Sequence, residues 1–146
     1  MTNRLHRLFA AATASALLAL SAPAKAQDAV PMTRDLFDLS WVVVDFAGRT
    51  GAVGTMTVPT LTINDGRSAD GQTPCATGWS GTVTMNLPAL TISDVEAYYD
   101  DKCPLVRETI AFLDGLERVR SARTTAEGLE LVSQDGIRLF LLNAGG

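Results

Sequence analysis

Residues 103–118 read Cys-Pro-Leu-Val-Arg-Glu-Thr-Ile-Ala-Phe-Leu-Asp-Gly-Leu-Glu-Arg, and their hydrophobic spacing decides the fold class. Apolar and neutral side chains recur there at a helical period; they are Leu105, Thr109, Phe112, Leu113 and Leu116, flanked by Val106 and Ile110. The charged side chains fall on the other side; they are Arg107, Glu108, Asp114, Glu117 and Arg118. Pro104 suits the first helical position, where its missing N–H costs nothing. Gly115 weakens the helix by up to about 1 kcal/mol relative to alanine, so packing must stabilise the amphipathic helix predicted from Pro104 to Arg118.

The rest of the chain reads as short strands separated by turn residues. β-Branched and aromatic residues or period-two alternation mark seven segments: 39–46, 55–63, 82–87, 89–92, 119–123, 128–132 and 137–142. Asn64-Asp65-Gly66 and Asp135-Gly136 are turn signals between antiparallel neighbours, whereas 67–80 reads as a loop. The pattern predicts an α+β fold, a single antiparallel β-sheet of about seven strands packed on one α-helix.

Length and charge limit the classes of function. The chain has 146 residues, enough for one domain, with 12 basic and 16 acidic side chains. Removing the first 26 residues takes away three basic groups and no acidic one, which leaves a net charge of −7. Such a charge excludes nucleic-acid binding by general phosphate attraction and disfavours an anionic membrane surface as a partner.

The amino terminus has the pattern of an export signal. Basic residues between Arg4 and Arg7 precede the apolar stretch 8–20, which is too short to span a bilayer as a helix, and Ala24-Lys25-Ala26 is an A-x-A cleavage site. We expect cleavage after Ala26 and a periplasmic or secreted product without a transmembrane segment; the alternative is a buried amino-terminal helix. The expected organisation is a signal peptide over 1–26, an approach segment over 27–38 and one domain over 39–146.

The two cysteines, Cys75 and Cys103, predict a structural disulfide, because an oxidising compartment leaves thiols paired. A redox-active pair and a metal site are the alternatives. Redox pairs are normally spaced C-x-x-C, and a metal would need further soft or imidazole ligands. After cleavage the chain has no histidine and no third cysteine, so we expect neither a metal nor a cofactor.

Other chemical motifs have simpler interpretations. Without histidine, and without G-x-S-x-G spacing in 78–81, serine-hydrolase chemistry is not expected. The glycine-rich stretch 48–54 lacks the lysine and following helix of a phosphate loop and reads as a turn. The acidic stretch 94–101 lacks the alternating ligands of a calcium loop, so we interpret it as a solvated loop before the helix.

Trp79, Tyr98 and Tyr99 flank the two cysteines in the sequence. A closed disulfide would bring these aromatic side chains toward one region, which is typical of a binding surface. The interpretation that we favour is that they pack over the disulfide, and the binding surface is the alternative. They are the candidate binding residues.

Taken in order, several short motifs resemble the META (HslJ-like) domain family of exported bacterial proteins. The resemblance covers about residues 39–142 and rests on Trp41, Thr60-Leu61-Thr62-Ile63, Asp65-Gly66-Arg67, Gly71-Gln72-Thr73-Pro74-Cys75, Trp79-Ser80-Gly81, Cys103-Pro104, Glu108, Phe112-Leu113-Asp114-Gly115-Leu116 and Gly128-Leu129-Glu130-Leu131. Ala76 departs from it, since the family commonly has asparagine there, and so does the acidic Tyr99-Asp100-Asp101-Lys102, which replaces a threonine-containing approach. The resemblance implies a sheet curved around one helix, an association with envelope stress (as for a heat shock protein) or antibiotic tolerance, and no known catalytic residues.

The leading hypothesis is a non-enzymatic, monomeric exported domain that binds an unknown envelope protein or small molecule. One alternative is a periplasmic inhibitor of a hydrolase, with 64–80 as its projecting loop. The other is a hydrolase that uses a carboxylate pair such as Asp100 with Asp101 or Glu108.

The disulfide gives a testable prediction. Cys75 and Cys103 are 28 positions apart, and the chain-entropy model gives about 3.5 kcal/mol for closing such a loop. Reductant is therefore expected to lower the melting temperature measured by circular dichroism, and Cys75→Ala/Cys103→Ala is expected to melt lower and to ignore reductant. Equal melting of the unaltered protein with and without reductant would remove the disulfide from the account.

Overall fold

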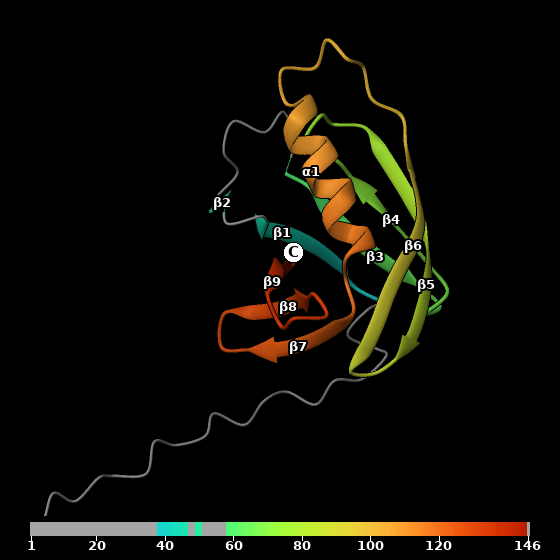
Figure 1. Cartoon of the computed structure of the whole chain (residues 1–146), viewed down its shortest axis with the longest axis vertical. Coiled ribbons are helices and arrows are strands. Elements are labelled where there is room, and N and C mark those ends of the chain that lie inside the picture. The colour runs from blue at the N-terminus through green and yellow to red at the C-terminus, as the bar shows by residue number, and fades with distance from the viewer. Residues whose placement is uncertain (1–37, 47–48, 51–57, 146) are drawn as a thin grey trace, which may run out of the picture.

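A computed structural model describes residues 38–46, 49–50 and 58–145 (Figure 1). The expected signal peptide 1–26, nearly all of the approach segment 27–38, and the loop 48–54 apart from Arg49–Thr50 lie outside the described residues. The strands are β1 (Ser40–Phe46), β2 (Arg49–Thr50), β3 (Thr60–Asn64), β4 (Ser68–Gln72), β5 (Gly78–Asn86), β6 (Ala89–Ala97), β7 (Ser121–Thr125), β8 (Gly128–Val132) and β9 (Arg138–Ala144). The helix α1 (Val106–Glu117) stands between β6 and β7.

The strands form one antiparallel sheet that bends into a ring. Neighbours follow the order β2-β1-β3-β4-β5-β6-β7-β8-β9, and β1 also pairs with β9. The α+β prediction of a single antiparallel sheet with one helix is therefore confirmed. The predicted count of about seven strands was too low, because the described residues contain eight strands of five residues or more and the two-residue β2.

The ring is weakest between β6 and β7. These strands share one residue pair, Ala89 with Ser121, whereas β5 and β6 pair along their whole length. The chain between β6 and β7 leaves the sheet, forms α1 and returns. Figure 1 shows α1 lying alongside β6, and α1 packs against both β6 and β9.

The buried stripe of α1 fills the concave side of the sheet. Phe112 and Leu116 are fully buried. The Phe112 ring centroid lies 5.5 Å from those of Phe46 and Phe140 and 6.1 Å from that of Trp79, with edge-to-face orientations. Such rings bury large apolar areas and prefer this geometry. The interior is thus plugged by the helix stripe that the sequence predicted, which explains why a helix containing a glycine is stable here.

The predicted loop over 67–80 was wrong. It contains β4 and the start of β5, joined by a turn over 73–77. β4 carries little strand signal because Ala69 is its only buried residue. Gly71 does not mark a loop; it allows the backbone of β4 to lie close to Thr60 and Trp79. A Cβ at this position would lie 1.9 Å from the carbonyl oxygen of Thr60 and 2.8 Å from Nε1 of Trp79.

The predicted loop over 94–101 was also wrong in its first half, because β6 continues to Ala97 instead of ending at Ile92. The register shifts between Ser80 and Thr82 of β5, opposite Asp94, whose φ is 52°. This β-bulge adds one residue and keeps the later apolar side chains on the inner face. The helix boundary differs by two residues, since α1 begins at Val106 rather than at Pro104. The turns predicted at Asp65-Gly66 and at Asp135-Gly136 are present, and Asp65, Gly66 and Gly136 have positive φ.

Replacement of Gly115 by alanine is expected to destabilise the protein. Alanine normally stabilises a helix by up to about 1 kcal/mol over glycine. Here a Cβ would lie 2.8 Å from Cζ of Phe140, whose buried ring is confined by Phe46 and Phe112. Overpacking of this kind typically costs about 1–3 kcal/mol.

Urea unfolding measures this cost, and Phe140→Leu provides the control. In that background Gly115→Ala should cost less than it does alone, because the obstructing ring is gone. A stabilising Gly115→Ala in the otherwise unaltered chain would show that the helix does not approach Phe140 this closely.

Candidate functional site

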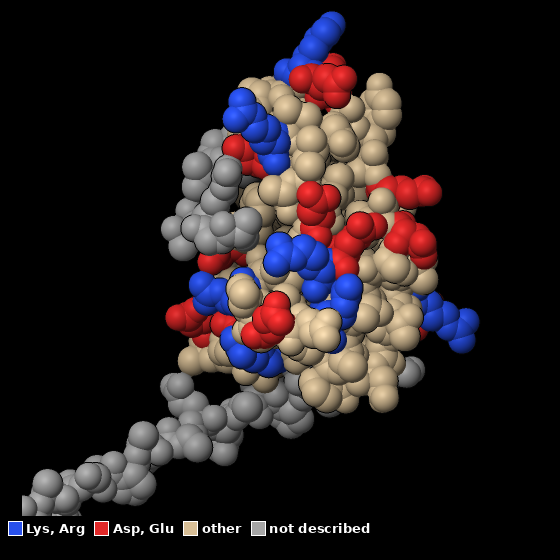
Figure 2. All heavy atoms as spheres, viewed as in Figure 1, with Lys and Arg blue, Asp and Glu red and all other residues tan. Residues whose placement is uncertain are grey.

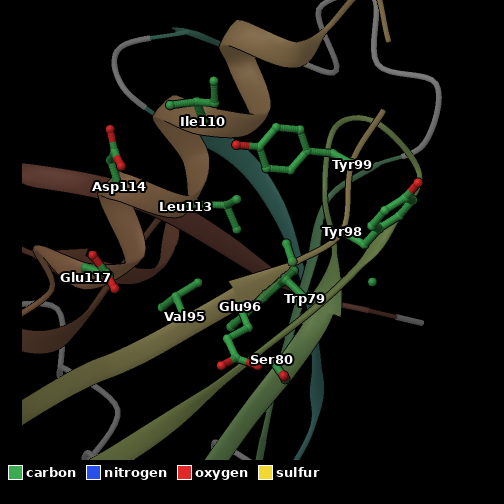
Figure 3. A pocket seen from close by; sticks show the side chains of 12 residues that line it. Trp79, Ser80, Val95, Glu96, Tyr98, Tyr99, Ile110, Leu113, Asp114 and Glu117 are labelled. Atoms are coloured by element: carbon green, nitrogen blue, oxygen red, sulfur yellow. The ribbon is translucent and has the colours of Figure 1, made fainter. Parts of the chain in front are cut away.

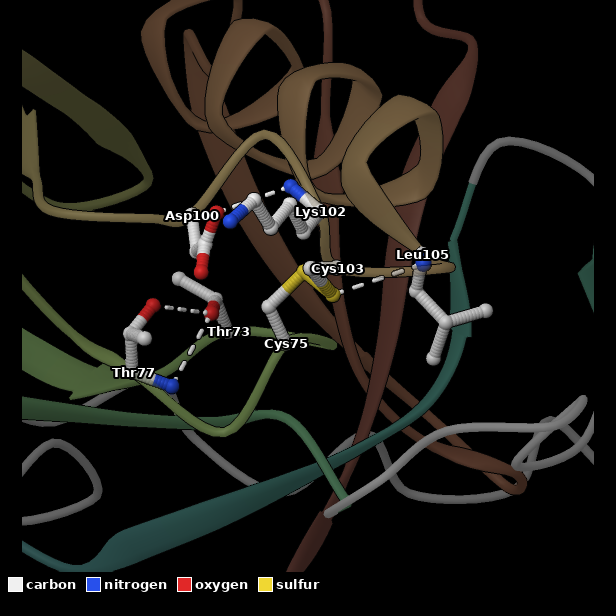
Figure 4. The surroundings of a disulfide bond; sticks show 7 residues. All are labelled: Thr73, Cys75, Thr77, Asp100, Lys102, Cys103 and Leu105. Carbon is white, nitrogen blue, oxygen red and sulfur yellow. Dashed lines mark hydrogen bonds between the residues drawn. A yellow bond between two sulfur atoms is a disulfide. The ribbon is translucent and has the colours of Figure 1, made fainter.

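The disulfide ties the start of α1 to the turn between β4 and β5 (Figure 4). Cys75 and Cys103 are bonded at 2.03 Å with Cα atoms 6.1 Å apart, so the predicted pairing is confirmed. The 73–77 turn is closed by hydrogen bonding between the Thr73 and Thr77 hydroxyls at 2.8 Å. The Leu105 amide donates to Sγ of Cys103 at 3.4 Å. The first turn of α1 is thereby held beside the beginning of β5.

A second stripe of α1 runs beside the buried one. Ile110, Leu113, Asp114 and Glu117 have the spacing i, i+3, i+4 and i+7, which places them on one face of the helix. Leu113 is half-buried, and the other three are exposed. Helical periodicity predicted Ile110 and Leu113 on the core side of the helix and Asp114 and Glu117 on the solvent side. In the structure all four line the same groove.

The opposite wall of this groove is the end of β6 and the residues that follow it. Residues 95–99 line it together with Gly78, Trp79 and Ser80 of β5. The groove has a volume of about 870 Å³, within the range of ligand sites. Figure 3 shows Val95 and Leu113 directed into the space between β6 and α1, with Tyr98 at the outer rim.

The three aromatic residues singled out in the sequence all line this groove. Trp79 is buried; its indole N–H donates to the carbonyl oxygen of Thr60 at 3.2 Å, and its ring packs against Phe112. Tyr99 is half-buried, whereas Tyr98 is 83% exposed. Tyr98 therefore does not pack over the disulfide, and a side chain this exposed has most of its surface available for contact.

The groove is acidic. Its lining includes three carboxylates, Glu96, Asp114 and Glu117, and no basic side chain. Within the described residues none of the three forms an ion pair. Arg120, which follows α1, uses its guanidinium for the backbone carbonyls of Glu117 and Val119, at 2.7 Å each. Figure 2 shows acidic side chains gathered over α1 and β6. Unpaired carboxylates around a concave surface give it a negative potential.

The carboxylates named as a candidate hydrolytic pair do not line the groove. Asp100 accepts a hydrogen bond from the Lys102 amide at 2.8 Å, and its carbonyl accepts one from the Cys103 amide at 2.8 Å, so it shapes the turn before α1. Asp101 and Glu108 are also absent from the lining. Among the described residues no group of three or more histidine, cysteine, aspartate or glutamate side chains has an arrangement that could hold a metal ion.

A separate ion-pair cluster joins β1, β8 and β9. Arg138 contacts Asp45 at 3.0 Å, Glu127 at 3.0 Å and Glu130 at 3.4 Å, and Glu130 also pairs with Arg123. The hydrogen bond to Glu130 is the main cause that raises the pKa of Arg138 above its ordinary value; Glu127 and Asp45 add to it, and desolvation opposes it. Asp45 and Glu130 are buried, so these arginine contacts offset part of the cost of burying their charges, although Oδ1 of Asp45 has no hydrogen-bond partner among the described residues. We assign this cluster to stability rather than to ligand binding.

Within the described residues no helix is long and apolar enough to cross a membrane. No protein-family model matches the chain, and no curated protein matches it. Among solved structures, the NMR structure of a protein from Burkholderia xenovorans is similar, with a TM-score of 0.56 and 18% sequence identity over 76% of this chain and 85% of that one. At this identity the similarity shows a shared fold.

Proposed function

We propose that this chain is an exported, non-enzymatic META (HslJ-like) domain that acts by binding a ligand or partner in the groove between α1 and β6. The observation that carries the proposal is the groove itself, with buried and exposed aromatic rings on one wall and, around it, three carboxylates that form no ion pair within the described part of the chain. Exposed apolar surface beside polar groups is typical of recognition sites. Tyr98 and Ile110 provide such surface here, at 83% and 42% exposure.

The export part of the proposal rests on two independent features. The A-x-A motif at 24–26 follows a short apolar stretch. The Cys75–Cys103 disulfide is of the kind that persists in oxidising compartments. Together they favour the periplasm or the medium outside the cell.

The family part of the proposal rests on the resemblance, and several of its motifs have structural roles. Asp65-Gly66 forms the β3–β4 turn with both residues at positive φ, and Gly115 packs against Phe140. Ala76, which stands where relatives commonly have asparagine, has a φ of 62°. Asparagine is enriched at such left-handed positions, so the backbone here fits the family's residue. A role in envelope stress or antibiotic tolerance follows from this kinship.

Two other functions remain distinguishable by experiment. A carboxylate-dependent hydrolase would use the groove acids, Glu96, Asp114 or Glu117, to convert what binds there. A hydrolase inhibitor would instead present 64–80, which the structure shows as β4, a disulfide-bound turn and the start of β5.

The test is amide NMR on the oxidised chain from residue 27 to 146, titrated with fractions of an envelope extract. We expect at least one fraction to shift amides of 95–99 and 110–117. Ile110→Gln should weaken that response, whereas Ile137→Gln should not, because Ile137 is equally apolar and 58% exposed but lies outside the groove lining.

Three outcomes would contradict binding at the groove as the function. Equal responses of the two isoleucine variants would place the site elsewhere. Shifts confined to 73–77 together with loss of a hydrolase activity would favour the inhibitor. Conversion of the bound molecule that is lost in Asp114→Asn would favour the hydrolase.

A further inference from the structure

Among the residues that the structure describes, the outer edge of β6 has no strand partner over most of its length. In the ranges that the structure describes, β6 pairs with β7 only through Ala89, although its pairing with β5 continues to Ala97. Two further backbone bonds join the same end, from the Leu90 amide to Arg120 and from the Ala122 amide to Pro88. Beyond Leu90 the strand therefore presents a row of free backbone donors and acceptors, which is a template for another extended chain.

The helix beside this edge does not complete the sheet. An α-helix uses its own carbonyls for its amides, so α1 meets β6 through side chains alone. Its stripe of Ile110, Leu113, Asp114 and Glu117 forms the far wall of the groove. The near wall includes the last three residues of β6, 95–97, so the unpaired edge of β6 opens into the groove at this end of the strand. The space between them thus has a hydrogen-bonding wall and a side-chain wall.

The two faces of β6 differ in chemistry along this edge. Val95 lies on the inner face, where it packs against the core and lines the groove with Leu113 and Trp79. Glu96 is exposed on the outer face, where it lies opposite Ser80 in the register between β5 and β6. Because side chains alternate along a strand, a chain added here would place every second residue against apolar groups and the intervening residues near carboxylates.

Charge decides between a second copy of this chain and a different partner. A second copy docked edge to edge would bring its Glu96 and its groove carboxylates against those of the first, and like charges at such an interface oppose pairing. Lysine or arginine on the added strand would instead neutralise Glu96, Asp114 and Glu117, none of which has an ion-pair partner among the described residues.

We propose that the groove binds an extended segment of a partner polypeptide, which adds to the free edge of β6 as a strand and alternates apolar with basic residues. The inference rests on the proposed function, because it names the kind of ligand that the same groove takes. Backbone hydrogen bonds to β6 give the affinity, and the alternating side chains give the specificity, as in other β-strand additions.

The probe is a capped hexapeptide of alternating lysine and valine, added to the oxidised chain from residue 27 to 146 and followed by amide NMR. Its binding should shift amides of 91–97 and of the groove stripe of α1. Two further peptides carry N-methyl groups, one on every valine and the other on every lysine, so that each lacks the amide donors along one edge only. Strand addition uses one edge, so one methylated peptide should bind about tenfold more weakly and the other should bind nearly as well as the parent.

Charge is tested with matched variants. Asp114→Lys/Glu117→Lys should weaken binding of the parent peptide about tenfold, whereas Asp135→Lys, which changes an exposed carboxylate in the turn between β8 and β9, should leave it unchanged. A hexapeptide of alternating glutamate and valine should not bind.

Several results would overturn strand addition. These are parent-like binding by both methylated peptides, shifts that map outside the groove, and no binding at millimolar peptide. If an extract fraction still shifts the groove in an Ile110-dependent way while the peptide does not bind, groove binding stands and strand addition fails. If neither the extract nor the peptide shifts the groove, both proposals fail.

Discussion

The early separation of β6 from β7 is the constraint on which the rest of the structure depends. Within the described residues, β6 and β7 are joined only at one end, by the pair Ala89–Ser121 and two backbone hydrogen bonds beside it, so the ring of strands stays open over the rest of β6. The segment between the two strands becomes a helix whose buried stripe fills the interior, with Phe112 among the rings of Phe46, Trp79 and Phe140. The same separation leaves the edge of β6 without a strand partner among the described residues, so the filled interior and the groove both result from it.

The disulfide complements this arrangement at the other end of the helix. α1 has no side-chain cap at its first turn and no basic residue in its last turn, so capping adds nothing and the helix dipole is complemented only by Glu108 in the first turn. Its position comes from Phe112 and Leu116 inside and from Cys103 bonded to the turn before β5. The groove therefore has one wall in the sheet and one wall fixed to that sheet by a covalent bond.

The sequence predicted what depends on local pattern and missed what depends on tertiary contact. The period of 103–118 predicted the helix, and the cysteines predicted their bond. β4 was missed because its Gly71 serves an approach to Thr60 that no local pattern shows, and the end of β6 was missed because the bulge at Asp94 interrupts the alternation. Likewise, the sequence singled out the three aromatic residues that line the groove, but it did not place the helix residues opposite them, because periodicity cannot indicate which flank of a helix faces an unpaired strand.

Hydrogen exchange of the β6 amides in the free, oxidised protein tests the central claim most directly. If the outer edge is unpaired, amides between Thr91 and Ala97 must form two groups: those bonded to β5 exchange slowly, and those pointing toward α1 exchange at rates near those of open chain. The account predicts this division, with no such division over residues 79–83 of β5, which have β4 on one side and β6 on the other. Uniform protection along β6 would contradict it.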